Sequence, residues 1–191
     1  KDYFSHDDIS QIQQKAGTIL EESGRFENAF DLFRNTCNWE GIARLVLKYA
    51  PALMAQGRSR VLEEWITSLP GGMVDNDPWL LYWLGLSRLS SDPVAGVERF
   101  ESAFNLFRKQ EDTTGVFLTW SSIVQSITHF TMNLKELDQW IELLDELMET
   151  FGAPPPGEIN AGVTSNMFMA LVYRQPQNPM IDSWAERAHA L

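Results

Sequence analysis

The sequence predicts an all-α protein built from antiparallel helix pairs, and three observations lead to this prediction. Apolar residues recur at helical spacing along most of the 191 residues. Helix-breaking residues, namely Gly24, Gly57, Pro70 and the Pro-rich break at 153–157, interrupt this spacing at regular intervals. No run of alternating apolar and polar residues lies between hairpin-turn signals, so we expect no β-sheet.

The breaks divide the chain into ten expected helices, which form five pairs. Two of them begin with an aspartate followed by a proline, Asp77 with Pro78 and Asp92 with Pro93. The carboxylate can cap free N–H groups, and proline is favoured in the first helical turn. Residues 71–77 are expected to form a flexible loop. The expected helices span 7–23, 25–37, 38–56, 58–69, 78–90, 92–110, 113–132, 134–151, 158–175 and 179–191.

The pairs recur at a spacing near the tetratricopeptide period of about 34 residues. Small residues let two helices approach closely, and aromatic residues fill the space between them. Residues of this pattern are Ala16, Gly17, Gly24, Phe26, Ala29 and Phe33 in the first pair, and Leu84, Gly85, Gly96, Phe100 and Ala103 in the third. Because one repeat cannot bury its apolar face alone, we expect a single domain over 1–191, a tetratricopeptide-like right-handed superhelix of about five antiparallel helix pairs.

Two residues are expected in the core. Trp65 has the helical spacing from Val61, Leu62 and Leu69 that places it on the apolar side of a short helix. Cys37 ends an apolar helix without an activating neighbour and is expected to be a small core residue. A single cysteine cannot form an internal disulfide, which favours a reducing cytoplasm as the setting.

The net charge of −11 argues against binding to nucleic acid, because release of counterions from phosphates requires clustered Lys and Arg. Residues 110–191 hold 3 basic and 11 acidic groups, so the acidity is concentrated in the second half. No charged residue lies between Asp112 and Lys135, but hydroxyl, amide and imidazole groups interrupt this run. A helix buried among other helices is therefore favoured over a membrane span.

Motifs for catalysis, metal binding or phosphate binding are missing from the sequence. The histidines His6, His129 and His189 lie far apart, without metal-ligand spacing. None of the five lysines follows a glycine, so there is no phosphate-binding loop. Ser87 lacks the second glycine of a nucleophile elbow. We expect no enzyme activity, no cofactor and no metal.

The uncharged helix at 113–132 offers the best ligand hypothesis. Its polar residues follow i, i+3, i+7, i+10 spacing on one face and, with a tyrosine of the preceding repeat, would line the concave groove of a superhelix. These residues are Tyr82, Thr119, Ser122, Ser126 and His129. Hydroxyl, imidazole and aromatic groups without formal charge suit a small neutral inducer or a peptide backbone. The alternative is that these hydroxyls bond to carbonyls of their own helix.

An acidic stripe lies beside the apolar stripe of the helix expected at 134–151. Its members are Asp138, Glu142, Asp145 and Glu149. Charged faces usually contact only solvent, and a docking surface for a basic partner is the alternative.

Residues 16–107 resemble the helical region of MalT-like, LuxR-type transcriptional regulators of the signal-transduction ATPase class. The order and spacing of short motifs carry this resemblance: Gly-Arg-Phe-Glu at 24–27, Asn-Trp-Glu at 38–40, Ala-Pro-Ala-Leu at 50–53, Gly-Arg at 57–58, and Trp65 with Leu69 and Pro70. The resemblance implies a sensor module that receives an inducer or partner protein and signals to an ATPase switch outside this sequence.

Two functions follow from this reading. The first is a ligand- or partner-receiving module of a bacterial ATP-dependent transcriptional regulator, cut from a longer chain. The alternative is a general tetratricopeptide scaffold for protein–protein interaction without a role in transcription. Both are compatible with self-association of a full-length protein, and in both this segment itself contacts neither DNA nor membrane.

Overall fold

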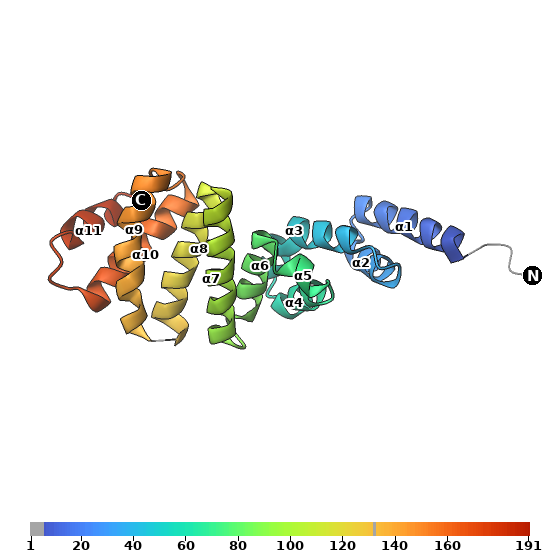
Figure 1. Cartoon of the computed structure of the whole chain (residues 1–191), viewed down its shortest axis with the longest axis horizontal. Coiled ribbons are helices and arrows are strands. Elements are labelled where there is room, and N and C mark those ends of the chain that lie inside the picture. The colour runs from blue at the N-terminus through green and yellow to red at the C-terminus, as the bar shows by residue number, and fades with distance from the viewer. Residues whose placement is uncertain (1–5, 132) are drawn as a thin grey trace, which may run out of the picture. The chain divides into compact units, whose positions relative to one another are not determined.

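The computed structural model describes residues 6–131 and 133–191, and all regular secondary structure within them is helical (Figure 1). This confirms the all-α class. The chain divides into two compact units, residues 1–76 and residues 77–191. The single repeat domain over 1–191 stays a prediction. Each of the ten expected helices corresponds to a helix of the structure, with ends that differ by a few residues.

The first unit contains two helix hairpins and one short additional helix. Neighbouring helices contact one another in chain order, α1 with α2, α2 with α3 and α3 with α4. The helices are α1 (His6–Glu22), α2 (Phe26–Asn35), α3 (Trp39–Ala55), α4 (Ser59–Thr67) and α5 (Gly71–Val74).

Helix α5 corrects the expectation of a loop at 71–77. The carbonyl of Pro70 accepts hydrogen bonds from the N–H groups of Met73 and Val74, at 2.8 and 3.3 Å. Val74 is buried, and this burial of an apolar side chain stabilises the single turn.

The aromatic core of the first unit is centred on Trp65, as expected. Its side chain is only 2% exposed. The ring stacks on Phe30, with centroids 4.8 Å apart, and meets Phe26 edge-on at 6.1 Å. Phe26 in turn stacks on Tyr49 of α3, so the aromatic side chains connect three helices.

Four helices end in the same left-handed turn. The residue at the turn has a positive φ and donates its N–H to the carbonyl three positions earlier, and the next residue donates to the carbonyl five positions before itself. The turn residues are Gly24, Cys37, Gly57 and Glu111. Cys37 therefore lies at an exposed helix end and not in the core, because the last apolar turn of α2 already ends at Phe33.

The second unit contains three further hairpins. Helix α8 contacts α6, α7, α9 and α10, and α10 also contacts α9 and α11. A π-helical turn, η1 (Ile127–Thr131), extends α8, and a short 3-10 turn, η2 (Leu134–Glu136), precedes α9. The α-helices are α6 (Pro78–Arg88), α7 (Pro93–Gln110), α8 (Thr113–Ser126), α9 (Leu137–Phe151), α10 (Glu158–Arg174) and α11 (Ile181–His189).

The capping residues expected from sequence are in place. Asp77 accepts hydrogen bonds from the N–H groups of Trp79 and Leu80, at 2.9 and 3.1 Å. Asp92 accepts from Ala95 at 3.1 Å. These carboxylates satisfy N–H groups that have no partner within the helix.

Glycines at the helix crossings allow very close approach. A methyl group on Gly85 would lie 2.9 Å from both the carbonyl oxygen of Gly96 and the ring of Phe100. A methyl group on Gly115 would overlap the ring of Phe107, which is fully buried. The hairpins therefore require these glycines for steric reasons.

We expect Gly115→Ala to lower the free energy of unfolding by about 1–3 kcal/mol, because the added methyl group overlaps Phe107. The matched control is Gly72→Ala, since no atom lies within 4 Å of the methyl group it adds. Urea denaturation followed by circular dichroism measures both. Equal stability of the two variants would show that α7 and α8 are not in close contact at this crossing.

Candidate functional site

The polar face expected on α8 is largely closed. Thr119 and Ser126 are buried, at 0% and 1% exposure. The Thr119 hydroxyl donates to the carbonyl of Gly115 at 2.6 Å, and the Ser126 hydroxyl donates to that of Ser122 at 2.6 Å. Both hydroxyls thus bond to carbonyls of their own helix, which was the alternative considered from sequence. The expectation that Thr119 and Ser126 line an accessible groove is wrong.

The other members of the expected ligand set lie in different environments. Tyr82 is buried, and burial raises the pKa of its phenol, while a side-chain hydrogen bond with Ser122 opposes this shift. The Ser122 hydroxyl also donates to the carbonyl of Leu118 at 2.9 Å. His129 is exposed on η1, with Nδ1 at 2.9 Å from the carbonyl oxygen of Gln125. The structure thus brings Tyr82 and Ser122 together and leaves His129 apart.

An accessible pocket lies instead between α7 and α9. Its volume is about 370 Å³, and it is open to solvent. Its lining combines aromatic, carboxamide and charged side chains, namely Glu101, Phe104, Asn105 and Arg108 of α7 and Gln139, Trp140 and Leu143 of α9. We call it the α7–α9 pocket.

Trp140 is the central aromatic residue of this pocket. Its side chain is 6% exposed, and its ring meets Phe104 edge-on with centroids 5.3 Å apart. Its backbone carbonyl accepts a hydrogen bond from Nε1 of Trp120 at 2.9 Å, which ties α9 to α8. Among the described residues, no group accepts a hydrogen bond from the buried Nε1 of Trp140. A buried donor without an acceptor is costly, and because this nitrogen has almost no solvent-accessible surface, a ligand in the open pocket contacts the ring of Trp140 and not its N–H.

Groups of opposite charge lie at the two ends of the α7 side of the pocket. Burial raises the pKa of Glu101, and the nearby carboxylates Glu136 and Glu98 raise it further. Two helical turns later, Arg108 donates to Glu146 of α9 at 2.7 Å and lies over the ring of Phe104. Arg108 also lines a second hollow, of about 480 Å³, with Glu111, Thr113, Thr150 and Phe151.

Sequence reasoning missed this pocket. The four lining residues of α7 follow i, i+3, i+4, i+7 spacing and therefore share one helical face, a signal that was available. Their partners on α9 begin 31 positions beyond Arg108, and no local pattern indicates which helix faces which. The pairing of α7 with α9 is a tertiary property.

The acidic stripe on α9 is divided between two environments. Asp138 pairs with Arg174 of α10, whose hydrogen bonds lower the pKa of that carboxyl. Glu142 and Asp145 are exposed and border a hollow of about 230 Å³ between α9 and α11, which Trp184 also lines. Glu149 is exposed.

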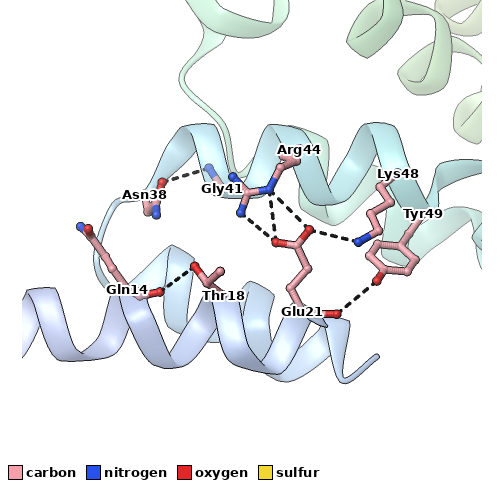
Figure 2. Close-up of polar contacts among 8 residues, drawn as sticks. All are labelled: Gln14, Thr18, Glu21, Asn38, Gly41, Arg44, Lys48 and Tyr49. Atoms are coloured by element: carbon pink, nitrogen blue, oxygen red, sulfur yellow. Dashed lines mark hydrogen bonds and ion pairs between the residues drawn. The ribbon is translucent and has the colours of Figure 1, made fainter. Parts of the chain in front are cut away.

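The densest polar network of the first unit joins α1 to α3. Figure 2 shows the Glu21 carboxylate between Arg44 and Lys48, at 2.8 and 3.4 Å. The Glu21 side chain is 8% exposed, whereas both cations are about half exposed. Hydrogen bonding from Arg44 holds the pKa of Glu21 below its ordinary value of 4.5, against the opposing effect of burial. The network is an ion-paired cross-link between two helices.

No protein-family model matches the sequence, and searches of curated proteins and of solved structures find no match either. Within residues 6–131 and 133–191, no helix has the length and apolar character needed to cross a membrane. In the same described residues, no group of three or more His, Cys, Asp or Glu side chains is placed to hold a metal ion.

We expect Ser126→Leu to cost about 1–3 kcal/mol of unfolding free energy, because the longer side chain must enter a filled interior. Gln125→Leu is the matched control, since it introduces the same leucine side chain at the exposed neighbouring position. It should change stability by less than about 0.5 kcal/mol. Chemical denaturation compares the two. An unchanged stability of the Ser126 variant would restore the original groove hypothesis.

Glu21 should make stability depend on pH. Folding lowers the pKa of Glu21, so the stability that this carboxylate contributes is fully present above pH 4.5. That stability is lost as the pH falls through the lowered pKa. Glu21→Gln should be less stable than the wild type at pH 7 by on the order of 1 kcal/mol, and this deficit should shrink below pH 4.5. Denaturation at a series of pH values measures the difference. Glu22→Gln removes an exposed neighbouring carboxylate and should show no such deficit at pH 7.

Proposed function

We propose that this chain is the ligand- or partner-receiving helical-repeat module of a bacterial ATP-dependent transcriptional regulator, acting in the cytoplasm. Its helix pairs would form a tetratricopeptide-like right-handed superhelix, and binding would be relayed to an ATPase switch outside this sequence. The module itself has no catalytic role. Support for the transcriptional part comes from the resemblance of residues 16–107 to MalT-like regulators.

The α7–α9 pocket carries the proposal that the module binds a ligand. It is accessible, and it combines the aromatic surface of Phe104 and Trp140 with several polar groups. Small-molecule sites commonly have this composition, an apolar surface with a few convergent polar groups that fix orientation. The pocket replaces the closed face of α8 as the candidate site.

The lining favours a ligand that is neutral overall. Glu101 and Arg108 contribute one charge of each sign, so a strongly anionic or cationic molecule would meet repulsion at one end. Asn105 and Gln139 can each donate and accept hydrogen bonds, which suits amide or hydroxyl groups. A small polar inducer fits this chemistry.

A general scaffold for protein–protein interaction is the second candidate. The exposed carboxylates Glu142 and Asp145 beside a hollow lined by Trp184 favour it, because such a surface resembles a docking site. The two candidates differ in their sequence context. A phosphate-binding loop upstream and a helix-turn-helix downstream in the complete reading frame would support the regulator, whereas their absence there would favour the scaffold.

Trp140→Phe tests the ligand proposal, because it keeps a six-membered aromatic ring at this position and removes the five-membered ring of the indole, which shortens the aromatic wall of the pocket. We expect at least one member of a panel of neutral sugars and short peptides to raise the thermal unfolding temperature of the wild type by mass action, and the variant to lose this shift.

The matched control is Trp39→Phe in the first unit, which removes an indole outside the pocket and should keep the shift. A panel without any stabilising compound, or equal shifts in all three proteins, would contradict the ligand proposal.

A further inference from the structure

The order of charges along α7 suggests a ligand with two charged ends. Glu101 and Arg108 both line the α7–α9 pocket and are seven residues apart on one helix. At 1.5 Å of rise per residue, their backbones are separated by about 10 Å along the axis. A ligand of that length can place one end at each residue.

The Glu101 end has a negative environment. Glu98 lies one turn earlier on α7, Glu136 lies on η2, and both carboxylates act electrostatically on Glu101. A ligand ammonium group at this position would be attracted by three carboxylates and would relieve their mutual repulsion. The lining residues supply no cation at this end, since Arg108 is two turns away.

The Arg108 end suits a carboxylate. The Arg108 side chain is 37% exposed, and its contact with Glu146 uses only one of the guanidinium nitrogens, Nη2. A guanidinium has five N–H donors, so it can bind a second carboxylate without releasing the first. Its position over Phe104 fixes its orientation.

The groups between the two ends match a peptide backbone. Asn105 and Gln139 offer donors and acceptors from opposite sides of the pocket. Peptide units present a carbonyl and an N–H at each residue, which are the complementary groups. Phe104 and Leu143 supply apolar surface for a side chain.

We propose that the α7–α9 pocket binds a short peptide with both termini free, its ammonium group at Glu101 and its carboxylate at Arg108. About three residues span the distance, because an extended chain covers about 3.3–3.6 Å per residue. The peptide is neutral overall, and its backbone groups bond to Asn105 and Gln139. This inference rests on the proposed ligand-receiving function and specifies the ligand of the same site.

Isothermal titration with the tripeptide Ala-Phe-Ala tests the inference. We expect saturable binding at one site of the full chain. Acetylation of the amino end and amidation of the carboxyl end remove one charge each, and each should weaken binding by about tenfold or more, as expected for loss of a charge-assisted hydrogen bond.

Paired variants locate each terminus. Glu101→Gln should weaken binding of the free tripeptide but not of its acetylated form, because the acetylated peptide no longer uses that carboxylate. Arg108→Gln should weaken binding of the free tripeptide but not of its amidated form, because the amidated peptide no longer presents a carboxylate to that guanidinium. The controls Lys109→Gln and Glu149→Gln change the same net charges outside the pocket and should leave affinity unchanged.

Absence of tripeptide binding overturns this inference, as does binding that is insensitive to blocking of the termini. Equal losses in the control variants would also overturn it, because attraction would then come from overall charge. If the tripeptide fails while another compound binds in a Trp140-dependent manner, the proposed function stands and only the peptide assignment falls. If neither binds, both fall.

Discussion

The close approach of paired helices is the constraint on which the rest of the structure depends. Glycines at the crossings leave no room for a Cβ atom, so Phe100 and Phe107 of α7 pack directly against the backbones of α6 and α8. These contacts fix the rotation of α7 about its own axis. The face that bears Phe104 and Arg108 is thereby turned toward α9, where it forms one wall of the α7–α9 pocket. The geometry of the candidate site is thus a consequence of backbone contacts elsewhere on the same helix.

Features determined by local interactions were predictable from sequence. The ten helices, the capping aspartates and the turn at Gly57 each depend on residues within a few positions of one another. Trp65 was predictable because its helix has only one apolar side. The same left-handed turn at Cys37 was missed, since cysteine rarely adopts a positive φ and its identity suggested burial. Helix α5 was missed because two glycines ordinarily indicate a loop, and burial of Val74 opposes that tendency.

The candidate site was not predictable from local pattern. Thr119 and Ser126 have the spacing expected of a polar face, but on a helix that contacts α6, α7, α9 and α10 these two positions face the interior, whereas Thr114 and Gln125 are the exposed positions of α8. Bonding to carbonyls of the same helix satisfies their hydroxyls at no tertiary cost, so hydroxyl spacing does not distinguish a groove from an interior. The pocket that does exist joins segments from two hairpins, and the register between α7 and α9 depends on tertiary contacts such as the Arg108–Glu146 pair.

The position of this pocket bears on how binding could be relayed. Helix α7 belongs to the hairpin with α6, and α9 to the hairpin with α8, so a ligand in the pocket contacts two successive hairpins. In stacked repeats each hairpin contacts only its neighbours, and the angle between neighbours sets the path of the whole array. A ligand that binds one inter-hairpin angle more tightly than another shifts the population toward that angle. Nε1 of Trp120 donates a hydrogen bond to the carbonyl of Trp140, which links α9 to α8, and α8 contacts α10. A ligand bound between two hairpins contacts both of them, so its binding acts directly on the angle between them. A ligand bound within one hairpin does not act directly on that angle.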